Sequence, residues 1–366
     1  MKKNVAIPMV AGILLSAAAL YLAFHKVPFD DLLGYLGSIN YWWILPTTGL
    51  ILLSFVFRVF RWKIILKNTI RIGFWEAFHP LMIGFMMNCI LPARIGEFAR
   101  PALLKKSRGI PMVTGLATVA TERVFDVIMM IALFALTFTS ITAQPHLERN
   151  YLGLRLNSDT LLAVGWGMVR LSIALLVFIG LLTMGASRNL IKRIIAGTAR
   201  VLSKAVPKFE RITLGISRFC INIIDNFSDG VSMVRQPASL LACLLLTVLI
   251  WGITVFSYVV FAKGCPGVNL TWPQLTTVMV VVCFFIALPS VPGFWGLWEA
   301  AGVFALSLFG ILEKDALGFT LVNHAAQIFP VIFAGLISAL ITSANIWQIS
   351  RNHRTMDVPG PSSKGA

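Results

Sequence analysis

Apolar segments of membrane-spanning length recur along almost the whole chain of 366 residues. A helix that crosses the hydrocarbon core of a bilayer needs roughly 20 consecutive apolar residues. Hydrophobic residues make up 57% of the chain and charged residues 13%, against roughly 45–50% and about 25% in soluble domains. We therefore predict an all-α polytopic membrane protein with about six full transmembrane helices. The predicted spans are 5–24, 43–60, 113–138, 171–186, 240–261 and 317–347.

Two further apolar segments, 74–91 and 278–288, each end in a short break that contains proline and glycine. Each break is followed by another apolar helix, at 98–104 and 298–311. Non-helical backbone at membrane depth must be covered by protein or water. The two pairs are therefore predicted to be either re-entrant loops or transmembrane hairpins.

The two breaks share a spacing. Pro92 and Gly96 of the first break recur 200 residues later as Pro292 and Gly296, with Gly293 beside them. Discontinuous helices at matching positions of two halves are typical of transporters built from inverted repeats. We therefore predict an inverted repeat with one broken helix in each half.

The chain is predicted to form one membrane domain with a tail. Isoleucine and leucine alternate with lysine and arginine between 188 and 236, which is typical of amphipathic helices on a membrane surface. The end of the chain is polar and rich in proline and glycine, which is typical of disorder. The predicted organisation is a membrane domain at 1–350, made of a first half at 1–186, a cytoplasmic linker at 187–237 and a second half at 238–350, and a disordered cytoplasmic tail at 351–366.

Basic residues are distributed unevenly around the apolar segments. The formal net charge is +16, and most of the 31 Lys and Arg residues lie at the N-terminus and in segments 58–71, 94–108, 188–235 and 351–366. Placing these segments on one side satisfies the positive-inside rule. We therefore predict a multi-pass protein of the inner membrane with both termini in the cytoplasm, and no nucleic-acid partner.

The first break is unusually rich in charge. It contains Asn88, Pro92, Arg94, Gly96, Glu97 and Arg100. Ionisable side chains at membrane depth are costly and often mark a pathway for polar cargo. Proline and glycine should break the helix and start a new one near Gly96, whose N-terminus suits an anion. The alternative is that Glu97 only neutralises an arginine and that the break is a simple turn.

Two other clusters lie inside predicted spans. Arg58 and Arg61, followed by Trp62, end the second span; arginine binds phosphate through two parallel hydrogen bonds, although ordinary interfacial anchoring explains this cluster equally well. Glu122, Arg123 and Asp126 lie within the third span. Glu122 and Asp126 share one helix face and Arg123 can pair with Asp126. This triad either lines a polar cavity or holds helices together as an ion-pair network.

The second break is less charged. Glu299 is its only acidic residue, and an isolated carboxylate at this depth needs a proton, a cation or an arginine partner. Asn323, His324 and Gln327 in the last span could donate hydrogen bonds, and His324 could carry a proton near neutral pH. The alternative for His324 is an ordinary packed and hydrogen-bonded histidine.

The chain lacks several common signatures of enzymes. It has no phosphate-binding P-loop, no Gly-x-Ser-x-Gly elbow and no His-Glu-x-x-His zinc motif, and its five scattered cysteines do not form a metal or disulfide framework. We expect no metal, no cofactor and no catalytic activity.

Four motifs together resemble those of the lysylphosphatidylglycerol synthase transmembrane family, also called flippase-like, which forms the membrane half of the bacterial multiple peptide resistance factor. The resemblance covers nearly the whole chain. The matching residues are Arg58, Arg61 and Trp62; Asn88, Pro92, Arg94, Gly96, Glu97 and Arg100; Glu122, Arg123 and Asp126; and Pro292, Gly293, Gly296 and Glu299. Two positions differ from the family pattern: Phe294 replaces a glycine, and Trp298 stands where arginine is common. Both weaken the expectation of an anion contact at the second break.

The resemblance implies lipid translocation or an accessory role rather than lipid aminoacylation, because no soluble aminoacyl-transfer domain is expected. We expect a flippase-like transporter of an anionic phospholipid or an isoprenoid-linked lipid. The residues expected to hold the phosphate are Arg94, Arg100 and Arg123, and those expected to balance charge are Glu97, Glu122, Asp126 and Glu299. One alternative is a non-transporting accessory or scaffold for a lipid-modifying or glycosyltransferase enzyme. Another is an integral-membrane transferase that uses Glu97 or Asp126 as a base.

Overall fold

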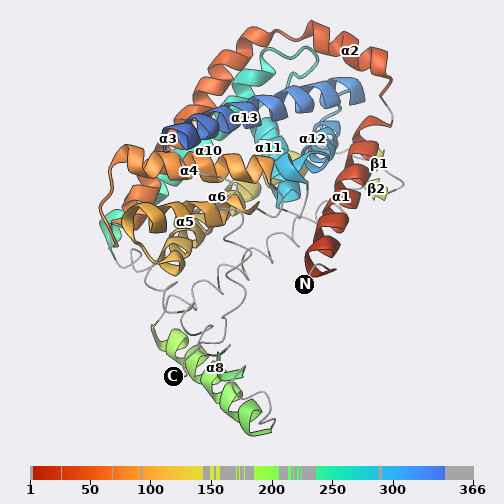
Figure 1. The fold of residues 1–366 in the computed structure, drawn as a ribbon. Coiled ribbons are helices and arrows are strands. Elements are labelled where there is room, and N and C mark those ends of the chain that lie inside the picture. The colour runs from red at the N-terminus through yellow and green to blue at the C-terminus, as the bar shows by residue number, and fades with distance from the viewer. Residues whose placement is uncertain are drawn as a thin grey trace.

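Over the residues that it describes, the computed structural model has helices and one short β-hairpin, and it confirms the predicted all-α membrane class (Figure 1). It describes residues 3–25, 27–67, 69–91, 94–142, 149–151, 154–156, 185–205, 236–287 and 291–342, with a few isolated positions between 170 and 224. Its helices are α1 (Lys3–Phe24), α2 (Phe29–Ser38), η1 (Tyr41–Trp43), α3 (Ile44–Leu66), α4 (Phe74–Ile90), α5 (Gly96–Arg108), α6 (Met112–Thr142), α8 (Gly185–Ala205), α10 (Pro237–Ala262), α11 (Trp272–Ile286), η5 (Pro292–Phe294), α12 (Leu297–Ser307) and α13 (Glu313–Ile341). Strands β1 (Arg149–Tyr151) and β2 (Leu154–Leu156) pair antiparallel, a hairpin that the sequence did not predict.

Within the described residues, three helices are long and apolar enough to cross a membrane. They are η1 with α3, then α10, then α13, and each overlaps a predicted span. Large apolar side chains such as Leu245 of α10 and Phe333 of α13 are exposed along them, as expected for helices that face lipid. Helices α1 and α2 form a further apolar pair bent by 79°. The predicted span at 171–186 lies largely outside the described residues, so the total number of spans stays a prediction.

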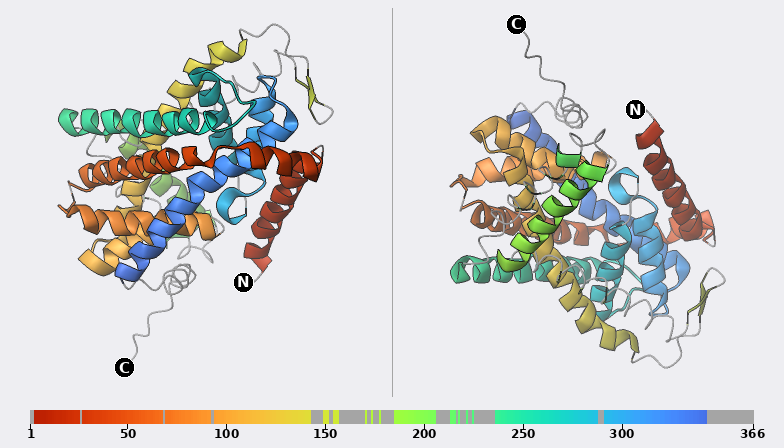
Figure 2. Two further views of the ribbon diagram at one scale, coloured as in Figure 1. Left: turned by 90° about the horizontal axis from the view of Figure 1, so that it is seen from above. Right: turned by 90° about the horizontal axis from the view of Figure 1, so that it is seen from below.

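Helices α3 to α6 and α10 to α13 form two repeats of the same order: a long helix, a broken pair and another long helix. The closest packing between the repeats joins α3 to α10 (Figure 2). Asn40 before α3 donates its backbone N–H to the carbonyl of Gly264 after α10, at 2.8 Å. At the other end, Arg61 of α3 bonds Thr247 of α10. The two helices are therefore antiparallel, and the repeats have inverted directions.

The repeats also exchange partners. Helix α4 of the first repeat packs against α13 of the second, and α11 of the second packs against α6 of the first. Figure 1 shows α13 beside α4. Each broken pair therefore contacts a long helix of the opposite repeat, so neither repeat can complete its packing alone.

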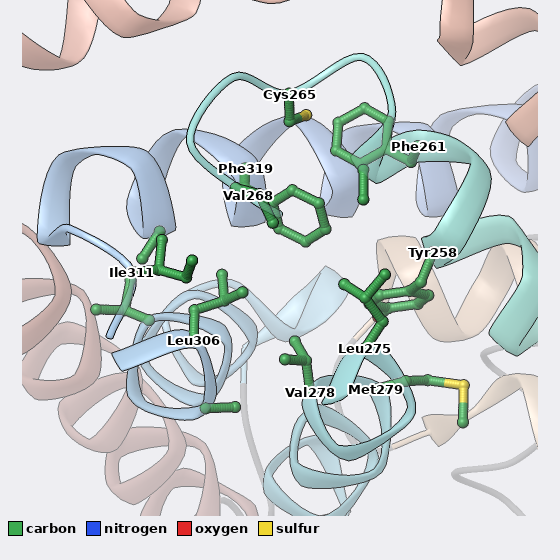
Figure 3. Close-up of a cluster of buried hydrophobic side chains, with 14 of the residues drawn as sticks. Tyr258, Phe261, Cys265, Val268, Leu275, Val278, Met279, Leu306, Ile311 and Phe319 are labelled. Carbon is green, nitrogen blue, oxygen red and sulfur yellow. The ribbon is translucent and has the colours of Figure 1, made fainter. Parts of the chain in front are cut away.

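Each broken pair returns to the end of the bundle from which it starts. In the first pair, Arg108 at the end of α5 forms an ion pair with Glu76 at the start of α4. In the second, Leu275 and Val278 of α11 belong to the same buried cluster as Leu306 of α12 (Figure 3). Re-entrant loops and transmembrane hairpins both return in this way. The helices of the two pairs, with 17, 13, 15 and 11 residues, are shorter than the roughly 20 residues that span a bilayer, which favours re-entrant loops that enter from opposite ends.

The tips of the two re-entrant pairs meet inside the bundle. Arg94 in the first tip donates to the carbonyl oxygen of Ile286 at 2.8 Å, and its guanidinium lies 5.9 Å from the ring centre of Phe294 in the second tip. Arg94 and Phe294 are exactly equivalent positions, 200 residues apart, and both have positive φ, 52° and 63°. Residues that contact their own repeat equivalents lie near the axis that relates the repeats. The pseudo-symmetry axis therefore passes close to these two side chains.

Two glycines allow the backbone of each broken pair to approach a neighbouring helix closely. A side chain at Gly96 would overlap the backbone carbonyl of Gly84, where α5 crosses α4. Gly296 has φ of 91°, and a side chain there would overlap the carbonyl of Ser16 in α1. The sequence indicated both residues as helix breaks, and α5 does begin at Gly96. The break that it assigned to Pro92 lies outside the described residues.

Replacing Gly296 by alanine should destabilise the fold. A non-glycine residue at positive φ costs about 1–2 kcal/mol, and overpacking adds about 1–3 kcal/mol. We expect Gly296→Ala to lower the free energy of unfolding by about 2–5 kcal/mol, measured by equilibrium unfolding in mixed detergent micelles. Gly252→Ala in α10 is the matched control, because its added methyl group would meet no atom within 4 Å beyond its chain neighbours and the backbone of its own helix. Equal stability of the two variants would contradict the packing described here.

Candidate functional site

The first repeat carries a buried ion-pair network around Asp126 of α6. Arg61 of α3, whose side chain is 0% exposed, contacts the carboxylate at 2.8 Å, and Arg58 lies at 3.8 Å. Helix α10 of the second repeat completes the site: Trp251 Nε1 donates to Asp126 at 3.2 Å, and Thr247 accepts from Arg61 at 2.9 Å. Asp126 therefore joins three helices drawn from both repeats.

A second buried pair lies beside the first. Arg100 of α5 contacts Glu122 of α6 at 2.7 Å, with side-chain exposures of 3% and 2%. Its guanidinium lies 4.2 Å from the ring centre of Trp62, which supplies a cation–π contact. Trp62 is itself fixed by a hydrogen bond to Thr118 at 3.1 Å. Arg61 and Arg100 are thus each paired with a buried carboxylate, although two guanidinium nitrogens of each have no hydrogen-bond partner.

Three arginines of the cluster are less enclosed. Arg123 is 37% exposed and contacts Asp126 at 3.5 Å and Glu97 at 3.9 Å. Arg94 and Arg58 are partly buried. Arg94 interacts with the carbonyl of Ile286, the last residue of α11, where the negative end of the helix dipole favours a cation. These three arginines, rather than Arg61 and Arg100, are the ones able to meet a ligand.

Positive charge exceeds negative charge in this region. Five arginines lie with three carboxylates, a surplus of two positive charges. Several buried guanidinium nitrogens of Arg61, Arg100 and Arg123 have no hydrogen-bond partner. Buried polar groups normally find partners in proteins or ordered water, so these donors indicate a site that accepts water or an anionic group. The remaining members of the cluster are Arg58, Arg94, Glu97, Glu122 and Asp126.

Asn88 also lies at the first break but is not part of the ion-pair network. Its side-chain oxygen is buried without a hydrogen-bond partner and lies so close to Gly96 that a side chain on that residue would overlap it. The structure therefore brings together all the described residues that the sequence selected in the first half. The triad forms the ion-pair network that was one of the two alternatives, with Arg123 at an exposed edge; its role in lining a polar cavity stays a prediction.

The second break contains a different arrangement, centred on Glu299. One carboxylate oxygen accepts the backbone N–H of Gly296 at 2.7 Å, which caps the N-terminus of α12. The other lies 2.6 Å from Nδ1 of His324. Nε2 of His324 lies 2.9 Å from the carbonyl oxygen of Gly293, and both side chains are 0% exposed. Glu299 therefore has a histidine partner rather than an arginine.

The two repeats carry related but unequal polar residues. Glu122, Arg123 and Asp126 of α6 correspond to Asn323, His324 and Gln327 of α13, each 201 residues later. Gln327 of α13 donates a hydrogen bond to Ser257 of α10 at 3.2 Å. This contact joins the first and last long helices of the second repeat, as the Arg61–Asp126 pair joins α3 and α6 in the first. The second repeat is therefore a largely uncharged version of the first.

The sequence missed two features of these sites. It did not indicate Thr247 and Trp251, which reach Asp126 and Arg61 from α10. They are four residues apart and so share a helix face, which was the available signal. It also did not pair Glu299 with His324; the 201-residue correspondence between α6 and α13 could have suggested this pair.

Neutralising a buried carboxylate should cost far more than neutralising an exposed one. Removing one partner of a buried ion pair typically costs about 3–5 kcal/mol because the other charge is left uncompensated, whereas an exposed pair contributes at most about 1 kcal/mol. We expect Glu122→Gln to destabilise the protein by about 3 kcal/mol or more, and Glu76→Gln, which weakens the exposed pair with Arg108, by about 1 kcal/mol or less. Equilibrium unfolding in mixed micelles measures both.

The double variant Arg100→Gln/Glu122→Gln provides a further check. It removes both charges and should be closer to wild-type stability than Glu122→Gln alone. If the double variant loses as much stability as Arg100→Gln and Glu122→Gln lose together when measured singly, the two residues do not stabilise one another.

Comparisons with known proteins agree with this architecture. The sequence profile of the lysylphosphatidylglycerol synthase TM region matches residues 9–335. Glycosyltransferase AglD of Haloferax volcanii is 25% identical over 372 residues, which cover 93% of this chain but only 55% of that protein. UPF0104 membrane protein MJ1078 of Methanocaldococcus jannaschii is 24% identical over 273 residues, covering 73% of this chain and 99% of that protein. No solved structure gives a significant match. Since the profile spans most of the chain, this multi-pass membrane protein belongs to the lysylphosphatidylglycerol synthase transmembrane family.

Proposed function

We propose that this protein moves a lipid with an anionic headgroup across the inner membrane, as a flippase-like transporter and not as an enzyme. The observation that carries the proposal is the surplus of two positive charges beside the point where the two re-entrant tips meet. Charge inside a membrane protein tends to face a polar pathway. A headgroup that crosses the bilayer must pass such a point.

Arg94 and Arg123 are the proposed headgroup ligands. Both retain accessible surface, and arginine can donate two parallel hydrogen bonds to one phosphate. Arg123 has only longer contacts, of 3.5 and 3.9 Å, to carboxylates, so a phosphate can replace them without leaving a carboxylate buried and alone. Arg58 lies 3.8 Å from the carboxylate of Asp126 and is the third proposed ligand.

An apolar cavity could accommodate the hydrocarbon chains of the same lipid. It has a volume of about 790 Å³ and lies between α3 and α13, with Trp295 among its lining residues. Trp295 directly follows Phe294, whose ring faces Arg94. The cavity therefore extends to the second tip, next to the proposed headgroup site.

The basic end of the bundle is proposed to face the cytoplasm. The end of α3, the start of α4 and the end of α5 lie there, and the positive-inside rule favours this side. Both termini are then cytoplasmic. The basic residues that define this end are Lys63, Lys67, Arg71, Lys105, Lys106 and Arg108.

The alternative is a non-transporting accessory of a lipid-modifying or glycosyltransferase enzyme. One observation favours it: a relative named as a glycosyltransferase matches nearly all of this chain, while this chain spans about half of that relative. In such a case the arginine cluster would hold a lipid for a separate enzyme instead of moving it. The test below separates binding from movement.

Removing either accessible arginine should stop lipid movement without unfolding the protein. The purified protein is reconstituted in vesicles with acyl-labelled fluorescent phosphatidylglycerol, and dithionite quenching reports transfer between leaflets. We expect Arg94→Gln and Arg123→Gln to slow transfer by about tenfold or more, because a hydrogen bond to a charged group is worth roughly 1.5–3 kcal/mol. Arg108→Gln, at an exposed ion pair outside the cluster, is the matched control and should transfer at the wild-type rate.

Three results have distinct meanings. Unchanged transfer in Arg94→Gln and Arg123→Gln would reject the assigned site. Absence of transfer by the wild-type protein, together with anionic lipid that co-purifies with it and is lost in both variants, would support the accessory role. Faster transfer of labelled phosphatidylcholine than of phosphatidylglycerol would reject the anionic substrate.

A further inference from the structure

The hydrogen bonds of His324 fix how many protons the second break holds. Nε2 lies 2.9 Å from the carbonyl oxygen of Gly293, which can only accept, so Nε2 must carry a hydrogen. Nδ1 lies 2.6 Å from a carboxylate oxygen of Glu299. Two bare lone pairs would repel at that distance, so this contact also contains a proton. The pair therefore holds one proton more than a neutral histidine and a carboxylate have between them.

The surroundings favour this loaded state. The second oxygen of Glu299 accepts the N–H of Gly296 at the start of α12, where the helix dipole stabilises negative charge. The ring of Trp298 stacks on His324 at 4.4 Å and 5°, and that of Trp295 lies at 4.4 Å. Aromatic rings stabilise a cation in contact with them. These contacts favour imidazolium and carboxylate over two neutral groups, and they give Trp298 a role although it replaces the arginine expected from the family pattern.

Loss of that one proton must break a contact. If the remaining ring proton stays on Nε2, the bond to Gly293 survives and the lone pair of Nδ1 faces the Glu299 carboxylate. If it moves to Nδ1, the bond to Glu299 survives and the lone pair of Nε2 faces the Gly293 carbonyl. Neither arrangement preserves both bonds. Deprotonation therefore releases either the tip backbone at Gly293 or the side chain that caps α12.

We propose that Glu299 and His324 form a binding site for one exchangeable proton, which latches the second re-entrant tip closed, and that release of the proton to water opens the tip. The ligand of this site is the proton itself. Opening would move Phe294, which contacts Arg94 of the first tip. The use of this proton to drive lipid movement rests on the proposed function, whereas the latch does not.

No ion pair joins Glu299 or His324 to any other group among the residues that the structure describes. Helix α12 carries no other titratable side chain, and η5 carries none. Several helices contact α12 or α13. The charged or titratable side chains that they and α13 carry are Tyr21 of α1; Asp30, Asp31 and Tyr35 of α2; Arg58, Arg61 and Lys63 of α3; Glu76, His79 and Cys89 of α4; Cys243 and Tyr258 of α10; Cys283 of α11; and Glu313, Lys314 and Asp315 of α13. Arg94 of the first tip lies against Phe294 of the second.

The latch is tested on the full-length protein by two measurements between about pH 5 and pH 9, the range in which histidines exchange protons. Nitrogen NMR of ¹⁵N-histidine-labelled protein reports the protonation of His324, identified among the five histidines by comparison with His324→Gln. Hydrogen exchange of the peptide 291–299, normalised to a peptide of α10, reports opening of the tip. We expect loss of the ring proton and an increase of about tenfold in exchange to occur together as pH rises.

Glu299→Gln is the decisive variant. A glutamine amide can donate to a neutral Nδ1 while its oxygen still accepts from Gly296, so it reproduces both bonds without the extra proton. We expect the peptide 291–299 to remain protected at every pH in this variant. Leu297→Ala provides a neighbouring change on α12 that leaves the pair intact, and it should retain the pH-dependent transition.

The outcomes separate the latch from the transporter. A neutral His324 beside an ionised Glu299 throughout the range, or a pair that never exchanges its proton, would overturn the latch. Identical pH dependence of exchange in Glu299→Gln and wild type would do the same. Lipid transfer is also measured in vesicles with a pH gradient. If the tip opens with pH but the protein moves no labelled phosphatidylglycerol, the latch is supported and the transport function is rejected. If wild-type transfer does not depend on the gradient and is lost in Arg94→Gln, the transport function is supported and its coupling to the proton is rejected.

Discussion

The contact between the two re-entrant tips is the constraint on which the rest of the structure depends. Broken helices leave backbone groups unpaired at membrane depth, where water is not available to satisfy them. Here each tip covers the other: Arg94 of the first satisfies the terminal carbonyl of α11, and the backbone of Cys89 approaches Gly293 of the second. This arrangement requires the loops to enter from opposite ends, and hence the antiparallel packing of α3 on α10 and the exchanged packing of α4 on α13 and α11 on α6.

The same scaffold carries different chemistry in its two halves. Where α6 presents Glu122, Arg123 and Asp126, α13 presents Asn323, His324 and Gln327 at equivalent positions. A fully charged second half would place another set of buried ion pairs in the bundle, each with a large desolvation cost. This division concentrates the surplus positive charge in the first repeat and leaves the second with the buried Glu299–His324 pair. The proposed anion site and the proposed proton site therefore lie in different repeats.

The class and the repeat could be predicted from the sequence because both leave strong local patterns: apolar runs for the spans, and the recurrence of Pro92 and Gly96 as Pro292 and Gly296 for the breaks. The members of the charged cluster were also recognisable, since charge in an apolar context is conspicuous. Their pairing was not, because Asp126 takes its partners from α3 and α10, and such contacts depend on how helices pack. The choice between re-entrant loop and hairpin likewise depends on where each helix ends, here short of the roughly 20 residues that span a bilayer. The bend between α1 and α2 was not predicted, because Pro28 is the only residue near it that indicates a break.

The position of Arg94 and Phe294 connects the two sites. Both residues have positive φ, a conformation that side-chain-bearing residues adopt at a cost of about 1–2 kcal/mol and that persists only where the surroundings enforce it. Each tip is part of the surroundings of the other. A headgroup that draws Arg94 away from Ile286 removes a contact that holds the second tip, and release of the Glu299–His324 proton removes a contact from the same tip. Linkage is reciprocal, so if lipid binding at the first tip favours opening of the second, proton release at the second must favour lipid binding at the first to the same extent.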